Sequence, residues 1–249
     1  MSEVTFKVVI PARYASSRLP GKPLLAIAGR PMLQHVFERA QQSGAAEIVI
    51  ATDDARIEAA ATSFNASVCM TRADHNSGTE RIAEVVAQMG WDEDTIVVNV
   101  QGDEPLIPPS LISQVASGLS AHALAVVSTL ATPIVASQET QDPNVVKTVL
   151  DQDGFALYFS RAAIPYDRDG NGAGDVQMLR HIGLYAYRAG FLARYSQLQP
   201  SPLETTEKLE QLRVLWHGLK IHVGIANKVP GPGVDTKADL ERVESLMQG

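Results

Sequence analysis

The first 132 residues alternate between short apolar runs and segments with helical periodicity, and this alternation constrains the fold more than any other feature. Apolar runs predict strands, and apolar residues that recur every three or four positions predict helices. The expected strands are 4–10, 47–52, 67–71, 95–100 and 124–132, and the expected helices are about 32–40, 55–64, 82–89 and 110–120. Repeated βα units of this kind favour a largely parallel sheet with right-handed crossovers.

The second half of the chain has a different pattern. Two strand-like segments, 145–150 and 155–161, flank Asp151-Gln152-Asp153-Gly154, which predicts a hairpin turn. A Gly- and Asp-rich loop is expected at 167–175, and the remaining elements are strands at 181–188 and 221–226 and helices at 206–219 and 237–247. We therefore expect one α/β domain over 1–249, with a hairpin-bearing insertion lobe at about 135–200.

Charge and cysteine content exclude several classes of protein. The net charge of −7 disfavours a general nucleic-acid or anionic-membrane binder, because the overall field repels phosphate. The single cysteine, Cys69, excludes a disulfide framework and a cysteine-based metal cluster, and it favours a reducing compartment. No segment approaches the roughly 20 apolar residues that span a bilayer, so we expect a cytoplasmic protein without membrane insertion.

A cationic loop follows the first strand. Residues 11–23 contain Arg13, Arg18 and Lys22 and no acidic residue. Cations and free backbone N–H groups in a long loop beyond a strand suit a polyphosphate. The loop is not a P-loop, because Pro23 follows Gly21-Lys22 where Ser or Thr would stand. A solvated surface loop is the alternative interpretation.

Two acidic residues distant in sequence are candidate ligands for Mg²⁺. Asp103 follows the strand 95–100, and Asp235 precedes the last helix. Mg²⁺ prefers one or two carboxylates, completed by phosphate oxygens and water. Each Asp also has a structural explanation, as a turn residue or as a helix cap. The sequence alone does not indicate whether the two carboxylates converge.

Ser77-Gly78-Thr79-Glu80 fits an S-x-x-E capping box before an apolar helix. A helix start presents free N–H groups, so Ser77, Gly78 and Thr79 are also candidates for reading a base edge.

These segments together resemble the 3-deoxy-manno-octulosonate (Kdo) cytidylyltransferases. The resemblance covers nearly the whole chain and rests on an ordered set of segments at 9–23, 51–54, 76–79, 99–105, 159–161, 164–165, 181–185, 207–213 and 233–235. One departure is Glu80, where the family usually has Asp. The resemblance implies a Rossmann-like nucleotidyltransferase fold, a homodimer, and transfer of CMP from CTP to Kdo for lipopolysaccharide synthesis.

The resemblance also implies a role for individual residues. Arg13, Ser17 and Lys22 would hold the triphosphate, and Ser77, Gly78, Thr79 and Gln101 would complete the CTP site. Asp103 and Asp235 would bind Mg²⁺ and, with Arg13 and Lys22, form the catalytic set. The implied contacts to the Kdo sugar are Gln101, Arg161, His181, Tyr185, Glu210 and Gln211.

Two alternatives stay open at this point. A related acidic sugar such as 8-amino-Kdo could be the acceptor, because one amino group need change only one pocket contact. A non-catalytic nucleotide-binding module could use the same fold, since fold alone does not give activity. The pair Asp103 and Asp235 favours catalysis, because nucleotide binding alone would not need two such acids.

Overall fold

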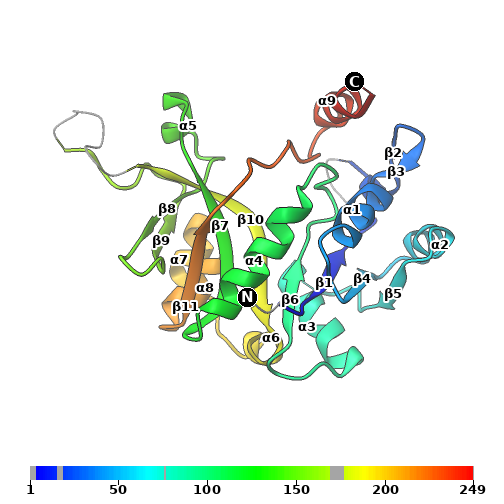
Figure 1. Ribbon diagram of the computed structural model, residues 1–249, viewed down its shortest axis with the longest axis horizontal. Coiled ribbons are helices and arrows are strands. Elements are labelled where there is room, and N and C mark those ends of the chain that lie inside the picture. The colour runs from blue at the N-terminus through cyan, green and yellow to red at the C-terminus, as the bar shows by residue number, and fades with distance from the viewer. Residues whose placement is uncertain (1–3, 16–18, 76, 169–176, 249) are drawn as a thin grey trace.

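The computed structural model describes residues 4–15, 19–75, 77–168 and 177–248. A nine-stranded sheet forms the centre of this part of the chain, and its main path has the order β11-β7-β10-β6-β1-β4-β5 (Figure 1). The strands of this path are β1 (Lys7–Pro11), β4 (Glu47–Thr52), β5 (Ser67–Met70), β6 (Ile96–Asn99), β7 (Ala125–Pro133), β10 (Leu179–Arg188) and β11 (Lys220–Ile225).

The sheet is mostly parallel, as the sequence predicts. β1 pairs in parallel with β4 and β6, β4 pairs in parallel with β5, and β11 pairs in parallel with β7. β10 runs antiparallel to both β6 and β7 and joins the two parallel halves. Strands buried on both faces need apolar side chains on both sides, which explains the continuous runs of Val and Ile in β1 and β6.

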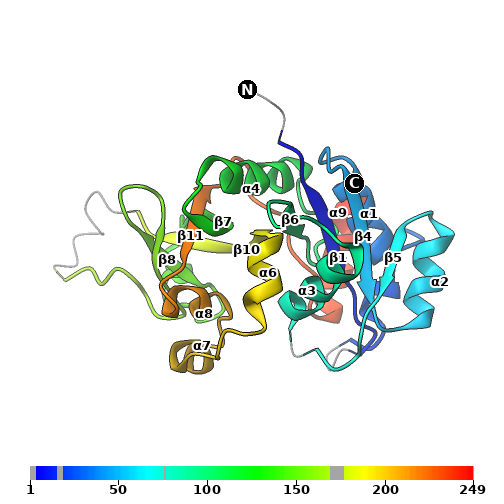
Figure 2. The same ribbon diagram turned by 90° about the horizontal axis from the view of Figure 1, so that it is seen from below.

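Helices cover both faces of the sheet (Figure 2). Apolar residues of α1 (Met32–Gln41), α2 (Ala55–Ser63) and α4 (Pro109–Ala121) pack with Val8 and Ile10 into one core cluster. Residues of α3 (Gly78–Met89) and α6 (Ala189–Tyr195) pack with Val9 into a second cluster on the opposite face. Because successive side chains of β1 alternate between faces, this single strand contributes to both cores.

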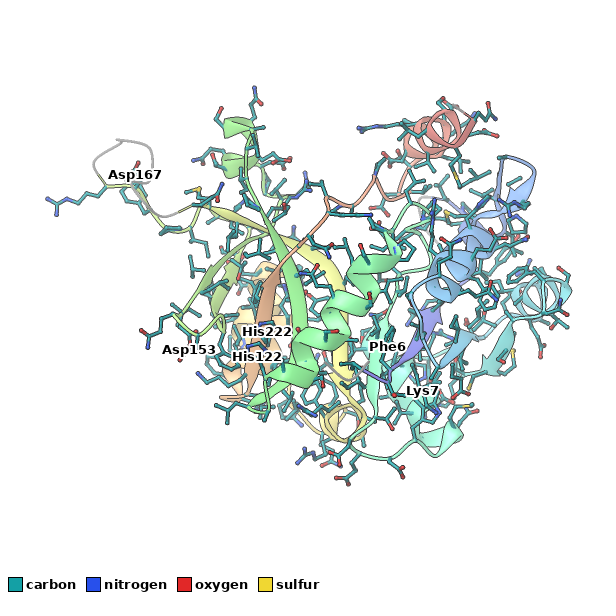
Figure 3. The ribbon with its side chains drawn as sticks, in the orientation of Figure 1. Phe6, Lys7, His122, Asp153, Asp167 and His222 are labelled. Carbon is teal, nitrogen blue, oxygen red and sulfur yellow. The ribbon has the colours of Figure 1, made fainter. Side chains whose placement is uncertain are left out.

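The predicted hairpin is confirmed. β8 (Lys147–Leu150) and β9 (Ala156–Ser160) pair antiparallel, and Asp151 Oδ1 accepts hydrogen bonds from the N–H groups of Asp153 and Phe155 in the turn. The short helix α5 (Ser137–Gln141) precedes the hairpin. Figure 3 places Asp153 at the tip of the hairpin, away from the cores.

The single helix predicted at 206–219 is wrong. The segment forms two short helices, α7 (Pro202–Glu207) and α8 (Gln211–Trp216), separated at Lys208, which has a left-handed backbone (φ 55°). A capping box starts α7 early, because the Ser201 hydroxyl accepts from Glu204 N–H and the Glu204 carboxylate accepts from Ser201 N–H. The left-handed turn at Lys208 ends α7 and redirects the chain, and it leaves Glu210 at the start of α8.

The sequence analysis also missed several small elements. These are α5, α6, the 3₁₀ helix η1 (Lys22–Leu24) and the two-stranded sheet of β2 (Ala26–Ile27) and β3 (Arg30–Pro31). The chain closes with α9 (Lys237–Gln248), as predicted. Of the loop expected at 167–175, residues 169–175 lie outside the described residues. In the described ranges, no helix combines the length and apolar character needed to cross a bilayer.

Candidate active site

The loop after β1 is fixed to its surroundings at its base. Gly21, with a φ of 69°, donates its N–H to Tyr14 O at 2.9 Å, and a Cβ at this position would lie 3.1 Å from the Tyr14 ring. The Arg56 guanidinium, on α2, lies 3.3 Å from the centre of the same ring. This packing fixes the start of η1, where Lys22 lies.

Lys22 joins the two distant acids. Its Nζ lies 2.7 Å from Asp103 Oδ2 and 3.2 Å from Asp235 Oδ1, and it also donates to Val234 O at 3.0 Å. Burial by itself would lower the pKa of the Lys22 ammonium, but the hydrogen bonds and charges of the two carboxylates raise it above its ordinary value. The carboxylates of Asp103 and Asp235 therefore converge on one cation.

Backbone contacts hold each acid in place. Gly102, just before Asp103, packs so closely on β1 that a Cβ would lie 2.9 Å from Pro11 O. Val234 N–H donates to Asp103 O at 2.9 Å, which ties the Asp235 segment directly to the Asp103 turn. This segment crosses from β11 to α9 over the carboxyl edge of the sheet (Figure 1).

The start of α9 orients Asp235. Asp239 Oδ2 accepts hydrogen bonds from the backbone N–H groups of Asp235 and Thr236, at 3.2 and 2.8 Å. Asp239 thus caps the start of α9, and the Asp235 side chain stays directed at Lys22.

Glu104 is a third acid at the same place, and the sequence analysis did not single it out. Burial, and then the charges of Asp103 and Asp235, raise the pKa of its carboxyl to about 7, and Lys22 opposes this shift. The acidic surroundings suit a divalent cation, since carboxylate oxygens are the ligands that Mg²⁺ prefers. No group of three His, Cys, Asp or Glu in the described part of the chain could hold a metal. The carboxylates of Asp103 and Asp235, which converge on one cation, offer two oxygen ligands of the kind that Mg²⁺ prefers, and phosphate oxygens and water would complete the set.

A cavity of about 460 Å³ opens beside the acids and contains many of the predicted residues. Its lining includes Gly78, Thr79, Gln101, Asp103, Tyr185, Glu210, Gln211 and Asp235. A second cavity, of about 710 Å³, adjoins it and contains His181, and Gln101, Glu104 and Gly183 line both. The fold therefore brings residues from β6, β10, α3, α8 and the segment before α9 to one place.

Glu210 faces this cavity from the start of α8. Thr79 Oγ1 donates to Glu210 Oε2 at 3.1 Å across 131 positions of sequence. Glu210 is accessible to water from the cavity, yet partial desolvation by the surrounding protein raises the pKa of its carboxyl. The break at Lys208 is what brings this carboxylate to the cavity wall.

The same cavity is lined by two further tyrosines that sequence patterns did not predict. Tyr187, on β10, and Tyr195, on α6, line the smaller cavity together with Asn99 at the end of β6. In the described structure, Asn99 Oδ1 and Tyr195 Oη are buried and have no hydrogen-bond partner. Asn99 could have been found from its position at the end of a strand. Tyr195 could not, because α6 itself was missed, and Tyr187 lies in the predicted strand 181–188, where nothing in the sequence distinguishes it from a core residue.

Other predicted residues lie around the cavities. Arg13 Nη2 donates to Ser77 O at 3.2 Å, and Ser77 Oγ caps α3 by accepting from Glu80 N–H. His181 Nε2 lies 2.9 Å from Thr129 Oγ1, and burial lowers the pKa of His181 to about 3, so its ring is neutral. Ser17 lies outside the described residues.

Among the predicted contacts to the sugar, Arg161 is the one that the structure does not bring to either cavity lining. Its Nε donates to Glu207 O at 2.7 Å and its Nη1 donates to Pro143 O at 2.8 Å. These bonds connect the end of β9 to α7 and to the segment before β8.

A lysine and two carboxylates at the carboxyl edge of a mostly parallel sheet, beside a polar cavity, are suited to phosphoryl transfer on a nucleotide. The sequence model of the cytidylyltransferase family matches residues 7–221. The chain is 57% identical, over 251 aligned residues, to the 3-deoxy-manno-octulosonate cytidylyltransferase of Nitrosococcus oceani, and the alignment covers 98% of this chain and 97% of that protein.

Solved structures agree with this classification. A CMP:2-keto-3-deoxy-manno-octonic acid synthetase complexed with CTP superposes with a TM-score of 0.91, at 46% identity and 98% coverage of both chains. A cytidylyltransferase from Leptospira borgpetersenii, 18% identical, has a TM-score of 0.65 over 98% of this chain and 87% of its own, and it shares the fold. The chain therefore belongs to the cytidylyltransferase family, among the 3-deoxy-manno-octulosonate cytidylyltransferases.

Proposed function

We propose that this protein transfers CMP from CTP to the anomeric hydroxyl of Kdo, giving CMP-Kdo and pyrophosphate for lipopolysaccharide synthesis. The observation that carries the proposal is the convergence of Asp103 and Asp235 on Lys22 beside a polar cavity. The names of the relatives at 57% and 46% identity support the choice of CTP and Kdo.

The nucleotide would lie between the loop after β1 and the start of α3. Arg13, Ser17 and Lys22 would neutralise and orient the triphosphate, since cations pair well with phosphate oxygens. Ser77, Gly78 and Thr79 would contact the cytidine, with Gln101 at the junction to the sugar. The hydrogen bond from Arg13 to Ser77 O supports this arrangement, because it joins the two segments.

Asp103 and Asp235 would hold Mg²⁺, which when bound neutralises charge that develops on the leaving pyrophosphate. The two aspartates contribute carboxylate oxygens at the edge of the sheet. The close packing of Gly102 and the hydrogen bond that Asp239 accepts from the backbone of Asp235 fix these oxygens in place. Lys22 would then contact the phosphate side of the same centre.

The acceptor sugar would occupy the cavity beyond the acids. Gln101, Tyr185, Glu210 and Gln211 line it and offer amide, hydroxyl and carboxylate partners for sugar hydroxyls. His181 would contact the sugar from the adjoining cavity. Arg161 would grip the carboxylate of Kdo only after its bonds to the Glu207 and Pro143 carbonyls have rearranged.

Catalysis would consist mainly of positioning. The anomeric oxygen forms a bond to the α-phosphorus of CTP while the bond from that phosphorus to the bridging oxygen breaks, and pyrophosphate leaves on the opposite side. Holding both substrates in this in-line geometry removes much of the entropic barrier. The adjacent nucleotide and sugar regions of the site suit this requirement.

An assay of pyrophosphate release tests the proposal. With CTP and Mg²⁺ present, release should depend on Kdo, and a panel with 8-amino-Kdo and a sialic acid identifies the preferred acceptor. A strong preference for another acidic sugar would reassign the acceptor. Absence of release with every sugar would contradict the enzymatic function.

A homodimer formed through the lobe at 135–200 is part of the same proposal, as is a cytoplasmic location. The lobe exposes large apolar side chains: Val135 is 92% exposed, Leu157 61% and Tyr166 85%. Contiguous exposed apolar surface marks an interface, so these side chains are candidates for the dimer contact. Light scattering should give twice the chain mass, and Leu157→Asp should give a monomer, whereas Leu246→Asp, on α9, should stay dimeric.

A further inference from the structure

We propose that Lys22 occupies the position of the divalent cation in the nucleotide-free protein, so that a metal ion binds the two acids well only when a triphosphate draws Lys22 away. This inference rests on the proposed function, because it assigns Asp103 and Asp235 to the metal. It concerns Lys22, which the sequence analysis assigned to the triphosphate and to the catalytic set.

The contacts of Lys22 carry the argument. Its ammonium bonds one oxygen of each acid, at 2.7 and 3.2 Å, and its third acceptor is Val234 O at 3.0 Å. An ammonium has three donors, so these bonds use its full capacity. The Lys22 side chain is 15% exposed, so the acids share an ammonium that is largely withdrawn from water.

A metal ion and this ammonium would compete for the same oxygens. Mg²⁺ binds carboxylate oxygens at about 2.1 Å, so it could not approach both Asp103 and Asp235 while the ammonium lies between them. Two cations at one point also repel each other, and the repulsion is strong where the surroundings are partly buried. Metal binding in the absence of nucleotide therefore requires the lysine to leave without a new partner.

A triphosphate supplies that partner. Lysine is a compact charge on a flexible four-carbon stem, so the ammonium can exchange carboxylate oxygens for phosphate oxygens by rotating its side chain. Lys22 starts η1 on a base fixed by Gly21 and Tyr14, so only the side chain needs to move. The metal and the nucleotide would consequently bind together, and unproductive metal binding would be suppressed.

Mn²⁺ binding without nucleotide or sugar tests this directly, with free Mn²⁺ measured by electron paramagnetic resonance. Lys22→Met should bind Mn²⁺ at least about tenfold more tightly than the unaltered protein, because it removes the competing cation. Lys208→Met is the matched control. Lys208 lines the same cavity without contacting either acid in the described structure, so its variant should change the affinity less than about twofold.

A second pair of variants separates competition from other causes. Lys22→Gln keeps a polar side chain and should also gain affinity, and circular dichroism identifies which Lys22 variant is folded. Adding Asp103→Asn to Lys22→Met should abolish the gain. The inference would be overturned if a folded Lys22 variant bound Mn²⁺ no more tightly than the unaltered protein does. Because the assay contains no CTP or Kdo, its failure would leave the pyrophosphate-release test unaffected.

Discussion

The imidazole rings of His122 and His222 stack with their centroids 3.7 Å apart and their planes inclined by 16° (Figure 3). His122 follows α4 and its Nδ1 lies 2.8 Å from Gly118 O, whereas His222 lies on β11 and its Nδ1 lies 3.0 Å from Ser128 Oγ. The pair therefore connects a covering helix to the edge of the sheet. Burial, and then the charge that His122 can acquire, lower the pKa of His222 to about 4.

This lowered pKa predicts acid sensitivity. The folded state favours the neutral form of His222. The contribution of this group to the unfolding free energy is therefore fully present above the ordinary His pKa of about 6.5, and it is lost as the pH falls from there towards about 4. The loss can reach about 3 kcal/mol of unfolding free energy. Urea unfolding of the unaltered protein and of His222→Phe, at pH 7 and at pH 4.5, measures it. The variant should lose less stability between the two pH values, and equal losses would contradict the prediction.

Gly102→Ala should disturb the Asp103 turn. Its new Cβ would lie 2.9 Å from Pro11 O, a backbone atom inside the sheet that has little freedom to move. We expect a loss of about 1–3 kcal/mol in stability and a lower kcat, because the strain displaces Asp103. Thermal unfolding and steady-state kinetics measure both. Gly183→Ala is the stability control, since a Cβ there meets nothing within 4 Å, and similar melting temperatures for the two variants would contradict the packing argument.

Glu210→Gln should act on the sugar rather than on the nucleotide. The substitution keeps the size of the side chain but removes the charge that strengthens hydrogen bonds to hydroxyls. We expect KM for Kdo to rise by about tenfold and KM for CTP to change less than about twofold. Glu241→Gln, on the exposed side of α9, is the control. Equal changes in both KM values would contradict the assignment of Glu210 to the sugar region.

The elements that follow periodicity could be predicted from sequence. The strands of the parallel half and α1 to α4 have apolar residues at regular spacing, and their order and type are confirmed. The break in the segment 202–216 could not be predicted, because the apolar residues at helical spacing, Leu209, Leu212 and Leu215, all follow Lys208, and the polar residues before it give no competing pattern. A left-handed residue that is not glycine or asparagine gives no sequence signal of its own.

Individual residues of the site could be predicted from sequence, but their convergence could not. Lys22, Asp103 and Asp235 each lie just beyond a strand or before a helix, so each was a candidate by itself. Their convergence depends on where the segment after β11 crosses the sheet, and spacing does not encode that path. Glu104, Tyr187 and Tyr195 were missed because nothing in the sequence distinguishes them from other turn and core residues.

The most direct test of the joint role of the two acids is the turnover of Asp103→Asn, Asp235→Asn and the double variant. Turnover is measured as Mg²⁺-dependent release of pyrophosphate from CTP in the presence of Kdo. Each single variant should lower kcat by about 100-fold or more with an unchanged circular dichroism spectrum, because each loses half of one cation site. The double variant should be little worse than the poorer single variant, since the two residues act as a unit. Near-normal turnover in both single variants would contradict the account.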